Sequence, residues 1–323
     1  MLHSSSFRSS KNRTTVRSQN VLRLTRAALQ TAYALSDDLG SSLAERLFTS
    51  PKRHPRPARE HAILESGRAF EIEVTLRAPR WNGAKTRVAA WRWGFGPTVL
   101  LVHGWEGRGA QLGAFIDALV AAGLSVVAFD APAHGDSPGT RLYLTDHADA
   151  IVDVAAAVGP LHATIAHSFG AAALLLARAR GGLDVARNVV ISPNVLIADS
   201  VRSFATLLAL DDLEREGLEH NLGQHSGVTV ESLRLDRLVG AREGGLLVFH
   251  DREDREVPIK HADRLATAWP NTRLVATDGL GHRRILRDST VIEATVAFAS
   301  HGIQPPVSDL VRVVDGWLDG KHH

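Results

Sequence analysis

Residues 165–172 of this 323-residue chain read Ile165-Ala166-His167-Ser168-Phe169-Gly170-Ala171-Ala172. A short apolar run ends at a serine, and small helix-favouring residues follow it, which predicts a sharp turn from a strand into a helix. Such a turn holds its serine in a strained backbone conformation, and it needs small residues two positions before and two positions after the serine. Gly170 meets this need, and Ala166 meets it with one extra methyl group. Ser168 is therefore a candidate nucleophile, although serine is also common as a helix cap.

Around this turn, short runs that are apolar on both faces alternate with amphipathic segments. The runs cover residues 98–102, 125–129, 164–166, 189–191, 246–249 and 273–276, and the helical segments cover 110–122, 144–158, 171–179, 260–269 and 287–300. This alternation is typical of a parallel sheet with helices on both faces. Residues 70–76 and 88–93 instead alternate apolar and polar side chains, so we expect two antiparallel strands at one edge. The predicted fold class is α/β, a three-layer α/β/α sandwich with a mostly parallel central sheet.

The remaining segments define the expected domain organisation. Residues 1–60 are predicted to be a basic N-terminal arm followed by helices at 21–35 and 42–48, with an extended segment at 51–57. The sheet domain covers residues 61–195 and 244–301. Residues 196–243 hold apolar positions at helical spacing, then an acidic stretch and a loop, which predicts a helical lid inserted into that domain. Residues 302–323 are predicted to be a tail with a short helix at 308–318.

The basic charge of the chain is concentrated near its N-terminus. Residues 1–60 contain 11 of the 37 lysines and arginines but only 4 of the 35 acidic residues, so the rest of the chain has a small excess of acids. A nucleic-acid-binding domain needs its positive charge on the folded part, so we expect no nucleic-acid partner. The chain has no cysteine. This excludes disulfides, thiolate metal sites and a cysteine nucleophile.

The sequence contains no stretch near the roughly 18–20 apolar residues that span a bilayer, so we expect no stable membrane insertion. The arm lacks the apolar middle region of a secretory signal. Its composition resembles a mitochondrial transit peptide, but a disordered extension on a cytoplasmic protein is the favoured interpretation. The oligomeric state is not readable from the sequence.

A serine nucleophile needs a base and an orienting acid, and the ends of two later strands supply both. One predicted strand runs into a loop that contains Asp251, Glu253 and Asp254, and the next is followed by His282, which stands directly after Gly281. The carboxyl ends of parallel strands meet at one edge of a sheet, so we expect these side chains to lie near Ser168. On position alone, each of the three carboxylates is a candidate for the acid.

The chain order Ser, Asp, His and the loops around these strands resemble the α/β-hydrolase superfamily over roughly residues 65–300. In that family a strand ends in His-Gly before an oxyanion loop, as in VLLVHGW at residues 99–105. The next strand ends in a turn similar to FDAPAHGDS at residues 129–137. The family acid stands shortly before a Val-Pro pair, and here this position selects Asp254.

The resemblance implies a role for each site residue. Ser168 attacks a carbonyl carbon, His282 accepts the serine proton, and Asp254 fixes and stabilises the imidazole. The backbone N–H groups of Trp105 and Phe169 form the oxyanion hole. The resemblance implies no cofactor and no metal.

Two other residues depart from the family pattern or stand close to it. In the second loop Ala133-His134 stands where the family often has Gly-x, and His134 is a candidate for lining the pocket. Asp130 is expected to hold the geometry of this loop instead of taking part in the chemistry.

Together these features predict a serine hydrolase that cleaves a carboxylic ester or related acyl bond of a small-molecule substrate through an acyl-enzyme. The same residues would also suit a thioesterase, an aminopeptidase, an acyltransferase or a carbon–carbon bond hydrolase, because a fold does not determine its substrate. A non-catalytic binding protein with the same shape, and a membrane-surface protein that uses the basic arm, remain as alternatives. The apolar face of the predicted lid favours a hydrophobic substrate group, unless it packs on the sheet domain.

Overall fold

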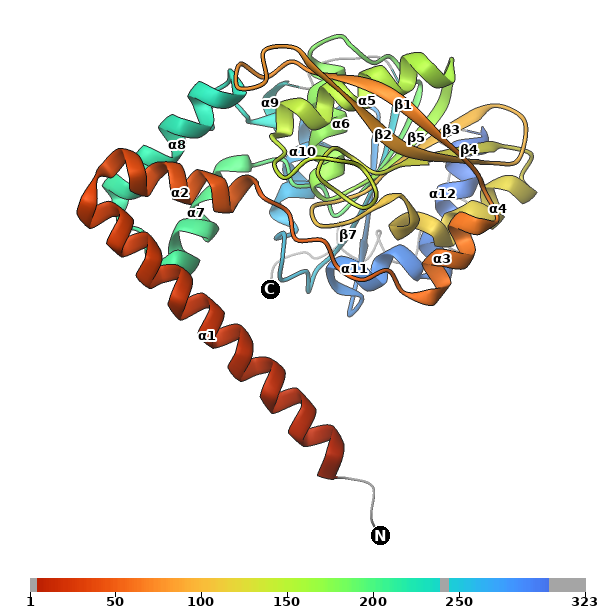
Figure 1. Cartoon of the computed structure of the whole chain (residues 1–323). Helices are drawn as coiled ribbons and strands as arrows, with labels where there is room; N and C mark the ends of the chain where they lie inside the picture. The colour runs from red at the N-terminus through yellow and green to blue at the C-terminus, as the bar shows by residue number, and fades with distance from the viewer. Residues whose placement is uncertain (1–4, 239–243, 302–323) are drawn as a thin grey trace, which may run out of the picture. The chain divides into compact units, whose positions relative to one another are not determined.

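The structure is a computed structural model that describes residues 5–238 and 244–301, with side chains from residue 19 onward. The chain divides into two compact units. One contains residues 1–50 and 197–232, and the other contains residues 51–196 and 233–323. The sheet belongs entirely to the second unit (Figure 1).

The described part of the second unit contains one eight-stranded sheet in the order β1-β2-β4-β3-β5-β6-β7-β8. The first two strands pair antiparallel with each other, and β2 pairs antiparallel with β4. All pairs from β4 to β8 are parallel, which confirms the predicted sheet with an antiparallel edge. The strands are β1 Arg68–Leu76, β2 Ala84–Trp93, β3 Thr98–Val102, β4 Ser125–Phe129, β5 Leu161–His167, β6 Arg187–Ile191, β7 Gly245–Asp251 and β8 Thr272–Thr277.

Burial explains why the central strands read as continuous apolar runs. Every residue of β3, β4 and β7 is buried, because helices cover both faces of the sheet. Val99 and Leu101 of β3 belong to the hydrophobic core on one face. Leu100 and Val102 point to the opposite face, because successive side chains alternate along a strand.

Two helical layers enclose the sheet, as predicted. On one side, α5 packs against β1 and α6, while α6 contacts β3 and β5, and α10 contacts β7 and β8 (Figure 1). On the other side, α12 contacts β5, β6, β7 and α4. The helices are α3 Ala58–Glu65, α4 Ile116–Ala121, α5 Leu144–Val158, α6 Phe169–Ala179, α9 Leu235–Leu238, α10 Lys260–Ala268, α11 Gly281–Arg284 and α12 Ser289–His301, with short 3₁₀ segments η1 Gly109–Phe115 and η2 Ile285–Arg287.

Some predicted boundaries were wrong. The helix expected at 110–122 is divided into η1 and α4, because Leu112 has non-helical backbone angles. Helix α3 was not predicted at all. It begins directly after Pro57, which is extended, and only Glu60 and Leu64 of it are buried. So weak an apolar pattern gives little signal in the sequence.

The first unit is helical in its described residues. It contains α1 Ser5–Leu35, α2 Asp37–Thr49, α7 Ile197–Leu208 and α8 Asp212–Ser226. Helix α2 packs against both α1 and α8. Two long-range contacts join these helices: His225 Nδ1 lies 2.7 Å from Glu45 Oε1, and the Tyr33 hydroxyl donates to the Glu214 carbonyl at 3.1 Å.

This unit alters two sequence expectations. The first helix begins at Ser5, well before the predicted Val21. The predicted acidic stretch and loop after residue 210 form the helix α8. The segment between β6 and β7 is helical as predicted, and it packs with the N-terminal helices. The predicted tail at 302–323 lies outside the described residues. No helix in the described ranges has the length and apolarity needed to cross a membrane.

Candidate active site

Ser168 lies at the turn between β5 and α6, with φ 52° and ψ −116°. Few residues other than glycine adopt a positive φ, so this conformation is strained. The serine hydroxyl makes no capping hydrogen bond with α6, although the residue stands at the cap position. Gly170 permits the turn, because a Cβ there would lie 2.2 Å from the His103 carbonyl oxygen. The turn therefore directs the Ser168 hydroxyl away from the helix backbone.

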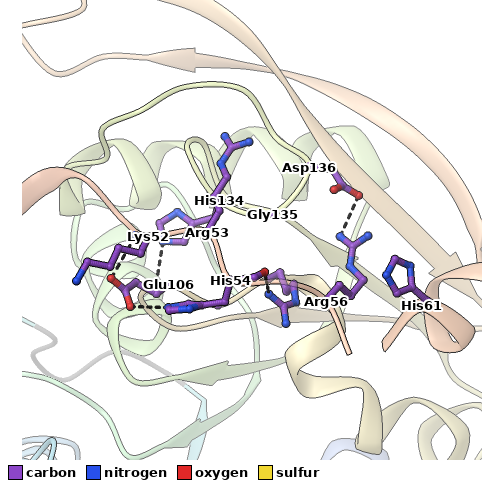
Figure 2. Close-up of a pocket in the computed structure, with 11 residues that line it drawn as sticks. Lys52, Arg53, His54, Arg56, His61, Glu106, His134, Gly135 and Asp136 are labelled. Carbon is purple, nitrogen blue, oxygen red and sulfur yellow. Dashed lines mark hydrogen bonds and ion pairs between the residues drawn. The ribbon is translucent and has the colours of Figure 1, made fainter. Parts of the chain in front are cut away.

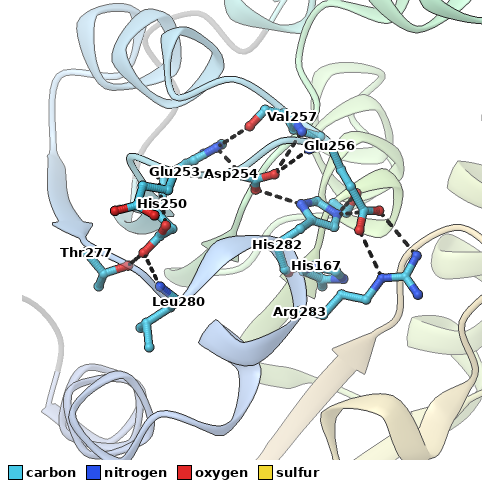
Figure 3. A network of polar contacts seen from close by, with 12 residues as sticks. His167, His250, Glu253, Asp254, Glu256, Val257, Thr277, Leu280, His282 and Arg283 are labelled. Atoms are coloured by element: carbon cyan, nitrogen blue, oxygen red, sulfur yellow. Dashed lines mark hydrogen bonds and ion pairs between the residues drawn. The ribbon is translucent and has the colours of Figure 1, made fainter. Parts of the chain in front are cut away.

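His282 meets this hydroxyl from another part of the chain. It lies on α11, the single helical turn that follows β8. Its Nε2 atom is 2.9 Å from Ser168 Oγ, and its Nδ1 atom is 2.7 Å from Asp254 Oδ2 (Figure 3). All three side chains are at least nine-tenths buried. The structure thus brings together the three residues that were expected to meet at one edge of the sheet.

Hydrogen bonds keep the Asp254 carboxylate ionised. Burial by itself would raise the pKa of this group, but the His282 imidazole and the backbone N–H groups of Val257 and Glu256 favour the charged form more strongly and lower the pKa to about 2. Both N–H groups donate to Oδ1 at 2.9 Å. An ionised acid at Nδ1 requires the proton on that nitrogen, so Nε2 is free to accept from the Ser168 hydroxyl.

Asp251 and Glu253 were the competing candidates for the acid. Asp251 accepts hydrogen bonds from the Thr277 hydroxyl at 2.8 Å and from the Leu280 N–H at 2.9 Å. It also accepts from the Glu253 N–H at 3.0 Å. Asp251 therefore holds the loop before His282, whereas Asp254 contacts the imidazole itself.

Comparison with known proteins shows which family model and which solved structures resemble this chain. The family model described as serine aminopeptidase, S33, matches residues 96–225. Est1E from Butyrivibrio proteoclasticus, solved with ferulic acid bound, is 19% identical with a TM-score of 0.55, over 66% of this chain and 94% of that one. The Pyrococcus furiosus esterase Pf2001 is 18% identical with a TM-score of 0.54, over 82% and 96% of the two chains.

A third solved structure, the Paleococcus ferrophilus monoacylglycerol lipase, is 19% identical with a TM-score of 0.52, over 67% of this chain and 99% of that one. No curated protein matches the sequence. The structural matches share the sheet and its helical layers with this chain, and the family model includes the turn at Ser168. The chain has the α/β-hydrolase fold.

The region expected to form the oxyanion hole lies beside Ser168. A Cβ at Gly104 would lie 3.2 Å from Ser168 Cβ, so the turn after β3 packs directly against the serine. The ring centroids of Trp105 and Phe169 are 5.2 Å apart in an edge-to-face arrangement. The side chains of the two residues predicted to donate to an oxyanion are therefore in contact with each other.

Two buried histidines fix the loops of this region. The His103 Nε2 atom accepts from the Ala131 N–H at 2.9 Å, and the His134 Nε2 atom accepts from the Glu106 N–H at 3.1 Å. Burial and neighbouring cations lower the pKa of His103 to about 3 and that of His134 to about 4. Both rings are therefore neutral and act as acceptors that hold the turns after β3 and β4.

Asp130 holds the loop geometry that was expected of it. Its carboxylate accepts from the Gly109 N–H at 2.6 Å and from the Asp136 N–H at 2.7 Å. A Cβ at Gly135 would lie 1.9 Å from the same carboxylate, so the loop needs glycine at this point. Burial raises the pKa of Asp130 to about 6, although these two N–H groups oppose the shift.

A pocket of about 250 Å³ has His134 in its wall, but Ser168, Asp254 and His282 do not line it, so the expected place of His134 in a substrate pocket stays a prediction (Figure 2). Its wall includes the segment 52–56, which the sequence assigned to a linker. The Glu106 carboxylate pairs with His54 Nε2 at 3.0 Å, and Arg56 pairs with Asp136 at 2.9 Å. These pairings hold the segment 52–56 against the loops that follow β3 and β4, and so support the position of the turn after β3.

Sequence reasoning missed two histidines next to the three central residues. His250 donates from Nε2 to the Val257 carbonyl at 2.8 Å, which supports the loop that carries Asp254. His167 lies beside His282, with ring centroids 4.7 Å apart. Both follow or end strands, but a histidine at a strand end is a weak signal in a chain with 16 of them.

Proposed function

We propose that this protein is a serine hydrolase that cleaves a carboxylic ester or a related acyl bond through an acyl-enzyme. The observation that carries the proposal is the continuous chain of short contacts from Ser168 Oγ through the His282 ring to Asp254. A serine hydroxyl is a weak nucleophile until a base accepts its proton, and this arrangement supplies that base. The strained turn that holds the hydroxyl next to His282 adds support.

The proposed reaction has two halves. In the first half, His282 Nε2 accepts the Ser168 proton as Oγ bonds to the acyl carbon, and the imidazolium then gives that proton to the departing alcohol. In the second half, His282 takes a proton from water, whose oxygen attacks the acyl carbon, and the serine leaves with that proton. Asp254 remains ionised throughout and stabilises the imidazolium. In this proposal the N–H groups of Trp105 and Phe169 hold the negative oxygen of each tetrahedral intermediate.

The substrate class rests on the comparisons and on the inserted helices. Among the similar structures, one is an esterase, one is a monoacylglycerol lipase and one binds ferulic acid, so an ester is the first substrate to test. We propose that α7 and α8 are the lid that was expected between residues 196 and 243. Leu207 and Leu213 on these helices are 52% and 78% exposed.

The proposal is tested by labelling with a fluorophosphonate probe, which reacts with activated serines. We expect the wild-type protein to be labelled and Ser168→Ala to remain unlabelled. Ser232→Ala, at an exposed serine that bonds only within its own turn, serves as the matched control and should be labelled like the wild type. A wild-type protein that is folded but unlabelled would favour a non-catalytic binding protein instead.

A second candidate function is aminopeptidase activity, because the matching family model is described as a serine aminopeptidase. Peptide cleavage would use the same three residues, with an amine as the leaving group. Measuring kcat/KM for p-nitrophenyl esters and for aminoacyl p-nitroanilides separates the two functions. A series of esters with increasing acyl length then tests the lid, since equal rates for short and long chains would contradict an apolar contact there.

A further inference from the structure

The base of the proposed triad lies on a short and permissive segment of the chain. Gly279 and Gly281, on either side of Leu280, have φ values of 73° and 64°. A Cβ at either glycine would meet no other atom within 4 Å, so no packed neighbour restricts the segment at the Cα atoms of these glycines. Because α11 contains only four residues, its own hydrogen bonds cannot hold His282 firmly. Contacts from outside the segment must therefore fix the imidazole.

One such contact comes from the residue directly before the nucleophile. The His167 Nε2 atom is 3.0 Å from the main-chain carbonyl oxygen of His282 (Figure 3). A carbonyl oxygen only accepts hydrogen bonds, so Nε2 of His167 must carry the proton and donate it. The other ring nitrogen then holds a lone pair, and a Cβ at Gly104 would approach it to 2.9 Å.

The surroundings of His167 keep it in this single form. The residue is 2% exposed, and its pKa is lowered to about 3 by burial and by the neighbouring His282. The ring thus remains a neutral donor across the pH range in which the enzyme would be assayed. A neutral ring at 4.7 Å also leaves the adjacent His282 free to become the imidazolium during the reaction, whereas a cation there would oppose it.

We infer that His167 is a positioning residue that ties the backbone of the base to the strand carrying the nucleophile. The strand β5 ends at His167, so one rigid element orients both the Ser168 hydroxyl and the His282 carbonyl. The Ser168–His282 contact is then determined by two hydrogen bonds to His282, one from His167 and one from Ser168, which are adjacent residues at the end of β5. This inference rests on the proposed function, because it concerns the geometry of that reaction.

Three substitutions at position 167 separate the hydrogen bond from simple filling of space. His167→Gln keeps an N–H donor at about the reach of Nε2, His167→Asn keeps an amide that ends too early, and His167→Leu removes the donor. We expect kcat to fall by about 10- to 100-fold in the Leu and Asn variants, since small displacements of a reacting group cost rates of this order, with KM within about twofold. The Gln variant should recover kcat to within about fivefold of the wild type.

The measurements are steady-state hydrolysis of p-nitrophenyl acetate, the rate of fluorophosphonate labelling and the thermal unfolding midpoint of each full-length variant. His162→Leu, near the start of the same strand, is the matched control and should keep the wild-type kcat. Loss of kcat in the Leu variant with recovery in Gln supports the inference. Equal kcat in the Leu variant and the wild type, or a Gln variant as slow as Leu, overturns it.

Ser168→Ala and His282→Ala distinguish this inference from the proposed function. If both are inactive while the three variants at position 167 keep wild-type kcat, the proposed function stands and the positioning role is wrong. If either alanine variant retains the wild-type rate, the proposed function itself is wrong.

Discussion

Replacement of Asp254 by asparagine gives the sharpest test of the proposed site, because the surrounding backbone dictates how the new amide must lie. The Oδ1 atom accepts from two backbone N–H groups, those of Glu256 and Val257. In Asp254→Asn the amide oxygen must occupy this place, since an NH₂ group there would face two donors. The NH₂ group then faces His282 Nδ1, which has to become an acceptor.

This change forces the wrong tautomer on the base. With Nδ1 unprotonated, a neutral His282 carries its proton on Nε2, where it points at Ser168 Oγ 2.9 Å away and cannot accept the serine proton. We expect kcat to fall by about 10⁴-fold, the size of the effect when a triad imidazole is held in the wrong tautomer. At about 1.4 kcal/mol for each factor of ten, this corresponds to about 5 kcal/mol of lost transition-state stabilisation.

The assay is steady-state hydrolysis of p-nitrophenyl acetate by the wild type and the variant, with thermal unfolding as a check on folding. Glu253→Gln is the matched control, because this side chain belongs to the same loop and makes no hydrogen bond or ion pair with His282 in the described structure. It should keep kcat within about twofold of the wild type. An Asp254→Asn variant that retains more than a tenth of the wild-type rate, or a Glu253→Gln variant that loses more, would refute the assignment of the acid.

Three further substitutions or conditions follow from contacts elsewhere in the molecule. Gly170→Ala places a Cβ 2.2 Å from the backbone oxygen of His103, so we expect loss of both soluble expression and probe labelling. Acidification from pH 7 to pH 5 should lower the urea midpoint, because the buried rings of His103, His134 and His167 have folded pKa values of about 3, 4 and 3 and bind protons only after unfolding. Asp130 and Asp146 act in the opposite direction, since burial raises the pKa of each to about 6, but these two carboxylates are outnumbered by the three rings. Asp211→Ala removes the side chain that caps α8 through the Glu214 N–H at 2.9 Å, and urea unfolding should show a loss of about 1 kcal/mol.

The parts of the fold that were predictable are those in which burial controls the residue type. Strands β3 and β4 were predicted with their correct bounds, because each residue in them is buried and the apolar run begins and ends with the strand. Helix α8 was missed for the opposite reason. Its sequence DLEREGLEHNLGQHS is polar on most sides, with only three buried residues, so it carries no clear amphipathic pattern.

The candidate site was predictable only to the extent that its residues follow strands. Ser168, Asp254 and His282 each come within five residues of the end of a strand of one parallel sheet, and position alone brings such residues to one edge. The contact of His167 with the His282 carbonyl has no such signal, because it depends on how closely a four-residue helical turn approaches the end of β5. The pairing of the segment 52–56 with Glu106 likewise joins elements that are distant in sequence.

The register of the sheet connects these separate observations. Strands β5, β6, β7 and β8 are consecutive neighbours, and Asp251 at the end of β7 pairs with Thr277 at the end of β8. The Asp251 carboxylate reinforces that pairing through the Thr277 hydroxyl and then accepts the Leu280 N–H, two residues before the base. His167 anchors the same short segment from β5 on the other side. The position of the imidazole is therefore fixed by strand ends on both sides of it, and the hydroxyl that it faces belongs to one of those ends. A slip of one residue between β7 and β8 would turn these side chains to the opposite face and separate the base from both partners.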